Sequence, residues 1–350
     1  MVAQQAPGRV LCLKPSLFLF LSLSLSLCVV FAVVSSQSQN PGYQTPFERH
    51  QTAMPTLKTL GNTALAALGR LPYFRGKGLL ALAVMRLCQA AQPLTLPLPH
   101  GGRMRVYNDG TGHYLIPYWI GKYERETVPV FMACVDQAAA GEVIVDVGAN
   151  VGFYTLLAGG ALRARPGRHI HAFEPNPAAF QLLQDNLRQN GFQNVTTFPQ
   201  GVADRAGRLR FYMEKEHSTS GSLRPLDWRD LTESLETPVV TLDQHLAQHP
   251  ALRAGLIKVD IEGAELPALR GARRVLAEHQ PYVLYEEYAP TFAAFDYTAA
   301  DLRAYLRGLG YALYALQRSG PQLQAPADDA ASGPWQNVLA VPPGRALPIA

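Results

Sequence analysis

Cysteine, charge and basic runs are all sparse in this sequence, and each shortage excludes a class of protein. Four of the 350 residues are cysteines, and they stand far apart with no C-x-x-C pair, so neither a zinc site nor a disulfide framework is predicted. Charged residues make up 17% of the chain, and the net charge is +4. A nucleic-acid partner is therefore not expected. Hydrophobic residues make up 48%, which is enough for a large folded core.

An uncharged apolar stretch covers residues 17–34, and Arg9 and Lys14 precede it. This pattern is typical of a signal peptide or a single membrane anchor. We interpret residues 1–53 as this hydrophobic leader followed by a polar linker that contains several prolines. Membrane contact is expected only through residues 17–34. A second interpretation stays open, in which the start codon is wrongly assigned and Met54 is the true first residue.

Residues 54–122 are expected to form a cap that is first helical and then extended. Two apolar helical stretches lie between residues 54 and 91, and Pro72 and Gly76 mark the break between them. Residues 93–108 are interspersed with proline and glycine, as expected for extended chain with turns.

From residue 123 to residue 350 the pattern is that of one α/β domain. After a helix over residues 124–139, segments of strand length alternate with helical segments. The predicted strands are residues 143–147, 169–173, 195–198, 209–213, 256–261, 282–287, 311–316 and 337–341. The predicted helices are residues 154–163, 177–189, 264–278 and 299–307. The alternation predicts a Rossmann-like, doubly wound, mostly parallel sheet with helices on both faces, to which the preceding residues add an N-terminal helical extension.

The strand at residues 143–147 runs directly into a turn with two glycines. Gly148 permits a tight turn, and Gly152 permits close approach of the backbone. A dinucleotide site would require G-x-G-x-x-G, but here Asn150 stands between the glycines and Asp146 precedes them. S-adenosylmethionine has an α-amino group and no phosphate, so an acidic residue beside the turn suits this cofactor. We predict that Asp146 binds the amino group, directly or through water. A helix-capping role for Asp146 is the alternative.

Glu174 follows the strand at residues 169–173 directly. An acidic residue about 20 residues after such a glycine turn accepts hydrogen bonds from ribose hydroxyls. Glu174 is therefore predicted to bind the ribose of an adenosine cofactor. The alternative is that it caps the helix that follows.

Charged residues alternate at the end of the strand at residues 256–261. Lys258, Asp260 and Glu262 would lie on one side if the strand continued, and such charges are costly at a sheet end unless they are paired or used. We predict Asp260 as the general base, with Glu262 as the second candidate. No metal is predicted there, because no histidine accompanies these acids. A structural Lys258–Asp260 ion pair, and a role of Glu262 and Glu265 in starting a helix, remain as alternatives.

Four segments resemble, in order and spacing, the signature blocks of the FkbM family of methyltransferases: VIVDVGANVGFYT, HAFEPNP, GVADRAG and LIKVDIEGAE. The resemblance covers about residues 123–288 strongly. It implies a seven-stranded class I methyltransferase fold, S-adenosylmethionine as cofactor, and methylation of a hydroxyl on a sugar, glycan or natural product. The resemblance implies these roles along the chain: methionine binding by Asp146, Gly148, Asn150 and Gly152, ribose binding by Glu174, adenine contact by Val202, Ala203 and Asp204, and a place beside the transferred methyl group for Asp260 and Glu262.

Two other functions remain open from the sequence. One is a nicotinamide-dependent oxidoreductase on a similar sheet, against which the missing third glycine counts. The other is a non-catalytic module that has kept the nucleotide-binding fold. Because S-adenosylmethionine is made and held in the cytoplasm, we expect a cytoplasmic enzyme. A membrane-anchored enzyme, held through residues 17–34, is the alternative.

Overall fold

The computed structural model describes residues 57–70, 77–88, 94–98, 102–106, 123–213, 221–226, 233–316, 323–324 and 335–348. They all belong to one compact unit, Pro55–Ala350. The predicted leader, residues 1–53, lies outside the described residues. Among the helices that the structure describes, none combines the length and the apolar character that a membrane crossing requires. The predicted domain boundary at residue 123 stays a prediction.

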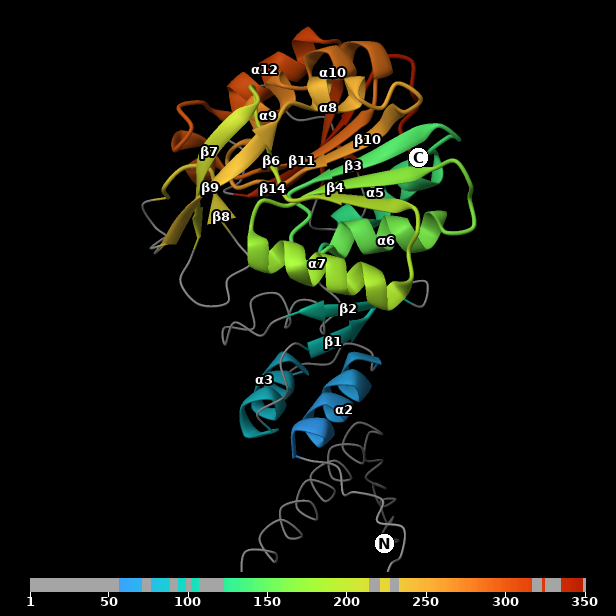
Figure 1. Ribbon diagram of the computed structural model, residues 1–350, viewed down its shortest axis with the longest axis vertical. Helices are drawn as coiled ribbons and strands as arrows, with labels where there is room; N and C mark the ends of the chain where they lie inside the picture. The colour runs from blue at the N-terminus through green and yellow to red at the C-terminus, as the bar shows by residue number, and fades with distance from the viewer. Residues whose placement is uncertain are drawn as a thin grey trace, which may run out of the picture. The chain divides into compact units, whose positions relative to one another are not determined.

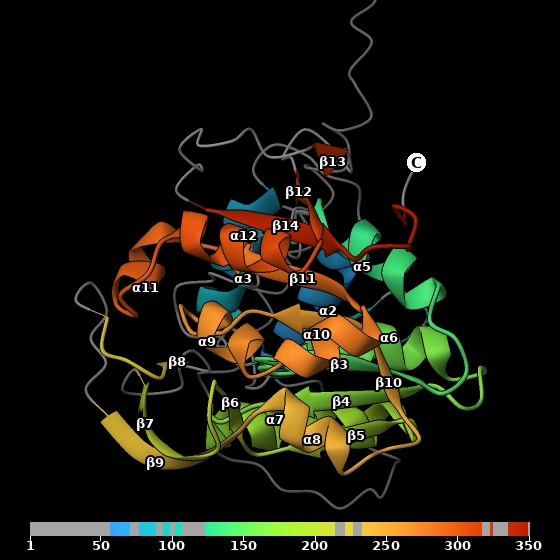
Figure 2. The same cartoon turned by 90° about the horizontal axis from the view of Figure 1, so that it is seen from above.

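An eight-stranded sheet forms the centre of the unit, in the spatial order β13-β12-β14-β11-β10-β3-β4-β5 (Figures 1 and 2). The strands are β3 (Glu142–Val147), β4 (His169–Phe173), β5 (Val195–Phe198), β10 (Arg253–Val259), β11 (Tyr282–Glu287), β12 (Ala312–Leu316), β13 (Leu323–Gln324) and β14 (Gln336–Val341). Strands β5, β4, β3, β10 and β11 pair in parallel, whereas β14 lies antiparallel between β11 and β12. The chain leaves β3 toward β5 on one side and later returns to β10 on the other. Ligands bind doubly wound sheets at such a reversal of strand order.

The predicted fold class is confirmed. Strands β4, β5 and β11 have the predicted bounds, and β3 begins one residue earlier than predicted. The seven predicted strands of the main sheet are present, and the two-residue β13 adds a short edge to β12. The predicted strand at residues 209–213 is β7 of a second sheet.

Helices cover both faces of the main sheet (Figure 1). One face carries α5 (Thr127–Asp136), α6 (Phe153–Leu162) and α7 (Pro177–Asn190), and the other carries α8 (Leu242–Ala247), α9 (Glu265–Arg270), α10 (Arg273–His279) and α12 (Ala299–Gly308). Side chains alternate along β3, so Val143, Val145 and Val147 pack toward α8 and α9 while Ile144 packs toward α5 and α6. The short helix α11 (Ala289–Ala293) follows β11.

The prediction of one helix over residues 264–278 is wrong, because the chain breaks at Gly271 into α9 and α10. A Cβ at Gly271 would lie 2.1 Å from the carbonyl oxygen of Ala203. At the next residue, Ala272, the backbone leaves the helical region with φ −112°. The break therefore results from a close approach of two backbones that are distant in sequence, which local periodicity does not report.

A second sheet of four strands, in the order β6-β9-β7-β8, leaves the main sheet after β5. Its strands are β6 (Gly201–Val202), β7 (Gly207–Met213), β8 (Gly221–Ser222) and β9 (Glu233–Val240). Neither β9 nor α8 was predicted from the sequence.

The N-terminal part of the unit consists of α2 (Leu57–Arg70), α3 (Lys77–Cys88) and a hairpin of β1 (Leu94–Pro97) and β2 (Arg103–Val106). Both predicted helices and the predicted extended segment are thus present. Met104 and Val106 of β2 are buried in a cluster with Leu65 of α2, Leu96 of β1 and Leu156 of α6. The hairpin is thereby joined to the main domain by apolar packing.

Two asparagines of α7 hold the hairpin by hydrogen bonds to its backbone. Asn186 accepts from the Arg105 amide at 2.6 Å and donates to the Arg105 carbonyl at 3.0 Å. The same side chain donates to the carbonyl of Val151 at 2.8 Å. Asn190 makes the equivalent pair of bonds to Arg103, at 2.8 and 2.6 Å. Asn186 is fully buried, so it connects hairpin, helix and glycine turn away from solvent.

We expect Asn186→Ala to lower the free energy of unfolding by about 2–4 kcal/mol, because it leaves part-buried backbone groups of Arg105 and Val151 unpaired. Asn190→Ala is the matched control and should cost about 1 kcal/mol, since its groups are closer to solvent. Denaturant unfolding of both variants tests this expectation. Equal losses for the two variants would contradict it.

Candidate functional site

The turn after β3 packs directly on the end of β10. The backbone is left-handed at Gly148, Asn150 and Gly152, with φ values of +81°, +51° and +99°. A Cβ at Gly148 would lie 2.0 Å from the carbonyl oxygen of Asp260, so glycine is required there. The amides of Gly148 and Ala149 donate to the carbonyl of Phe173 at the end of β4. The C-terminal ends of three neighbouring strands are thus fixed together.

Glu174 lies immediately after β4 and holds this turn. Its carboxylate accepts from the amide of Asn150 at 2.7 Å and from the amide of Asn176 at 2.8 Å. Burial raises the pKa of Glu174 to about 7, although these two amides act in the opposite direction. The helix-capping alternative for Glu174 is wrong, because Asn176 is the N-cap of α7 and accepts from the amides of Ala178 and Ala179.

Asp146 is buried at the end of β3, on the α5–α6 face of the sheet. Its Oδ2 accepts from the hydroxyl of Thr155 in α6 at 2.6 Å, whereas its Oδ1 has no hydrogen-bond partner among the described residues. Burial raises the pKa of Asp146, while Lys258 and both the hydroxyl and the amide of Thr155 act to lower it. The helix-capping alternative for Asp146 is wrong, because the N-cap of α6 is Gly152, and Oδ1 of Asp146 is left for another hydrogen-bond donor.

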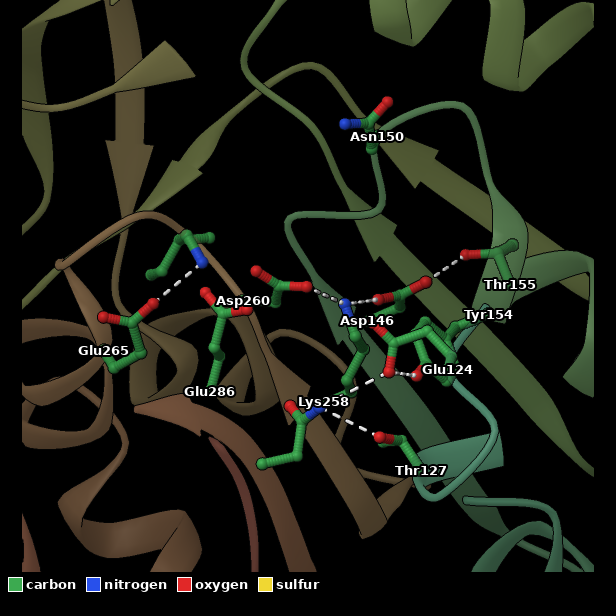
Figure 3. Close-up of polar contacts among 12 residues, drawn as sticks. Glu124, Thr127, Asp146, Asn150, Tyr154, Thr155, Lys258, Asp260, Glu265 and Glu286 are labelled. Atoms are coloured by element: carbon green, nitrogen blue, oxygen red, sulfur yellow. Dashed lines mark hydrogen bonds and ion pairs between the residues drawn. The ribbon is translucent and has the colours of Figure 1, made fainter. Parts of the chain in front are cut away.

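Lys258 of β10 connects Asp146 with Asp260, as Figure 3 shows. Its Nζ lies 3.1 Å from Asp260 Oδ2 and 3.9 Å from Asp146 Oδ1, and it stands 4.6 Å from the centre of the Tyr154 ring. Burial opposes the charge of the ammonium group, but Asp260, Asp146 and Glu124 outweigh burial and raise the pKa of Lys258. The predicted Lys258–Asp260 ion pair is therefore present.

The environments of the two acids beside Lys258 differ. The side chain of Asp146 is 1% exposed, whereas that of Asp260 is 38% exposed. A ligand can reach the carboxylate of Asp260 from solvent, while Lys258 contacts it from the inside. The arrangement leaves Asp260 as the accessible charged group of the cluster.

Three further acids lie around this cluster. Glu124 and Glu286 were not predicted from the sequence, and Glu265 was predicted only to help start a helix. Glu124, which precedes α5, accepts from the hydroxyl of Tyr154 at 2.9 Å, and burial raises its pKa. Glu286 of β11 accepts from the indole of Trp335, and burial together with the charge of Asp260 raises its pKa far above the usual range. Glu265 accepts from the amide of Ile261 at 2.9 Å, and burial raises its pKa to about 8.

Burial is the main cause of the raised pKa values of these three acids, and repulsion by the nearby Asp260 adds to it. Several carboxyl groups share one edge of the sheet, and one buried ammonium group cannot neutralise all of them. Asp260 keeps the direct contact with Lys258. Burial and repulsion by Asp260, which lies near Glu286 in Figure 3, favour the protonated form of Glu286. Sequence spacing could not reveal Glu124 or Glu286, because neither belongs to a recognisable motif.

The remaining predicted residues lie around the same edge. Glu262 has a left-handed backbone with φ +54°, and its carbonyl accepts from the hydroxyl of Ser222 at 3.0 Å. Val202 is buried in the core at β6, Ala203 is buried just after it, and Asp204 is exposed beside Arg205. The roles predicted for these residues in binding adenine and the acceptor stay predictions.

Several known methyltransferases are similar to this chain in sequence. The model of the methyltransferase FkbM domain matches residues 146–313. The 31-O-demethyl-FK506 methyltransferase FkbM of Streptomyces tacrolimicus is 28% identical over 64% of this chain and 90% of its own. The hexuronic acid methyltransferase AglP of Haloferax volcanii is 26% identical over 46% of this chain and 62% of its own.

Among solved structures, the methyltransferase FkbM from Methylobacillus flagellatus is 17% identical, covers 77% of this chain and 71% of its own, and has a TM-score of 0.37. The glycine turn, Glu174, Lys258 and Asp260 all lie within the matched residues 146–313. These matches make the chain a methyltransferase, and its residues 146–313 are similar to the FkbM domain.

Proposed function

We propose that this enzyme transfers a methyl group from S-adenosylmethionine to a hydroxyl of a sugar or natural-product acceptor. The observation that carries the proposal is the partly exposed Asp260 carboxylate, which Lys258 holds beside the glycine turn. The names of two relatives point to the same acceptor class, since one acts on a hexuronic acid and the other on an O-demethylated natural product. Neither the oxidoreductase nor the non-catalytic alternative gains support from the comparisons.

The residues at the turn fit S-adenosylmethionine. Asp146 Oδ1 is a buried acceptor with no hydrogen-bond partner among the described residues, and an α-amino group would supply the missing donor. Glu174 adds a second carboxylate at the neighbouring strand end, which suits ribose hydroxyls. Two carboxylates around a turn favour a ligand that has hydrogen-bond donor groups, and they repel a negatively charged phosphate.

We assign the rest of the cofactor contacts as the family resemblance implies. Gly148, Asn150 and Gly152 would line the methionine part. The segment of Val202, Ala203 and Asp204 would flank the adenine. When bound, S-adenosylmethionine supplies a methyl group that is already electrophilic, because it is attached to a sulfonium.

The chain's own contribution is to place and deprotonate the acceptor hydroxyl. Asp260 accepts the hydroxyl proton, because its carboxylate is 38% exposed and can be reached from solvent. Lys258 positions Asp260 and stabilises its ionised form through the 3.1 Å contact. Glu262 is the second candidate base, two residues further along the chain. The cytoplasmic location is part of this proposal, because the methyl donor is made there.

We expect Asp260→Asn to reduce kcat/KM for methyl transfer by about 10²-fold or more, because the amide cannot accept the proton. The measurement is transfer of labelled methyl groups to hexuronic acids and hydroxylated natural products, followed by kinetics on the acceptor that the wild-type enzyme uses. S-adenosylhomocysteine affinity should change little, since the Asp146 and Glu174 contacts are kept.

Asp136→Asn is the matched control, because Asp136 pairs with Arg165 on the exposed surface at the end of α5. Its activity should equal that of the wild type. Full activity in Asp260→Asn would rule out Asp260 as the base, and the same kinetics on Glu262→Gln would then test the second candidate.

We expect Glu174 to make cofactor binding depend on pH. Ribose hydroxyls donate to the ionised carboxylate of Glu174, whose pKa is about 7. The affinity for the cofactor should therefore be highest above pH 7 and should decrease as the pH falls below it. S-adenosylhomocysteine should bind about tenfold more weakly near pH 6 than near pH 8. Calorimetry at both pH values measures this change.

Glu174→Gln should weaken binding and flatten this pH profile, whereas the exposed Glu236→Gln should change neither. Nicotinamide adenine dinucleotide should not bind to any of these proteins. If the wild-type affinity were the same at both pH values, the ribose contact of Glu174 would be refuted.

A further inference from the structure

Three histidines converge on the α8 side of the main sheet, outside the site described above. His171 of β4, His245 of α8 and His249 just after α8 each offer one ring nitrogen, and these three atoms lie within 4.8 Å of one another. The Nδ1 of His171 is 2.9 Å from the Nε2 of His245. The ring centres form a nearly equilateral triangle, with separations of 5.0, 5.0 and 4.9 Å.

The histidine triangle and the Lys258 cluster lie on opposite faces of the sheet. On β4, Ile170 packs with the α5–α6 cluster, so His171 and Phe173 face α8. Lys258 follows Leu256 on the α5–α6 face. The histidines are therefore not part of the proposed methyl-transfer machinery.

The packing around the triangle buries two of its imidazoles among aromatic rings. His171 and His245 are 4% and 5% exposed, and the rings of Phe173 and Phe198 stand edge-on to His245 at 4.9 and 4.7 Å. The ring nitrogens of these two histidines are therefore held close together and shielded from water, and imidazole nitrogens are common ligands of transition metals.

We propose that His171, His245 and His249 bind a divalent transition-metal ion of the zinc class. Three imidazole nitrogens suit Zn²⁺, Ni²⁺ or Cu²⁺ and do not suit Mg²⁺ or Ca²⁺, which prefer oxygen ligands. Zinc–nitrogen bonds of about 2.0–2.1 Å in a tetrahedron separate the ligand nitrogens by roughly 3.3 Å. The observed 2.9 Å between two of these nitrogens and the 4.8 Å limit for all three bracket that value, so small ring rotations suffice.

The burial of the residues around the triangle indicates where an ion could enter. His249 is only half-buried, and its neighbours Gln248 and Pro250 are exposed. An ion would enter past His249, and a water molecule would complete the coordination on that side. Binding would join β4 to the segment that ends α8 and would stabilise the folded chain.

No metal was predicted from the sequence, because the chain has no C-x-x-C pair and no histidine accompanies Asp260. His245 lies in α8 and His249 follows the end of that helix, but the third ligand is 74 residues away from His245. That distance in sequence conceals the site.

The test is calorimetric titration of the full, untagged chain with Zn²⁺ after treatment with a chelator. We expect one ion to bind per chain and the melting temperature to rise. Co²⁺ in place of Zn²⁺ should give visible absorption of the intensity typical of tetrahedral coordination. His249→Gln, at the half-buried corner, should weaken Zn²⁺ binding at least tenfold while the variant stays folded.

His279→Gln is the matched control, because the side chain of His279 accepts from the amide of Ala254 and lies outside the triangle. It should bind Zn²⁺ as the wild type does. The proposal would be overturned by the absence of stoichiometric binding, by unchanged affinity in His249→Gln, or by an equal loss in His279→Gln. Binding of S-adenosylhomocysteine is measured separately, so failure of one proposal leaves the other intact.

Discussion

The packing of Gly148 on the carbonyl group of Asp260 is the constraint on which the proposed site depends. No side chain fits between the turn after β3 and the end of β10, so the two strand ends stand as close as their backbones allow. Asp146 and Asp260 are thereby brought to opposite sides of one lysine. The sheet edge becomes a small region in which acids from several strands share a single buried cation.

The acids around Lys258 differ in their exposure, their hydrogen bonds and their protonation. Asp260 is partly exposed and in direct contact with Lys258, Asp146 is buried with one oxygen that accepts no hydrogen bond from the described residues, and burial favours the protonated form of Glu286. In the function proposed above, the buried Asp146 would bind an amino group and the exposed Asp260 would remove a hydroxyl proton. The unequal burial of the same functional group would thus serve both tasks.

The sequence was informative wherever the signal was local. The glycines at 148 and 152, the acids that directly follow strands, and the alternation of strands and helices predicted the fold class, and they placed Asp146, Glu174 and Asp260 at one edge. The prediction failed where a contact joined distant segments. Gly271 breaks a helix because of Ala203, Glu124 enters the cluster through Tyr154, and His171 meets His245 across the sheet surface. Periodicity and motif spacing do not report contacts between residues that are far apart in the sequence.

The position of β14 has a consequence for the order in which this protein is assembled. β14 is the last strand in the chain, yet it lies between β11 and β12. Its Asn337 donates to Thr127 and Glu124, and Trp335 just before it donates to Glu286. During synthesis, β11 and β12 leave the ribosome without the strand that separates them, and the acidic end of the crevice lacks one wall. The proposed site can therefore form only after β14 has been translated, so a chain cut short before β14 would have an unpaired edge on each of β11 and β12 and no finished site.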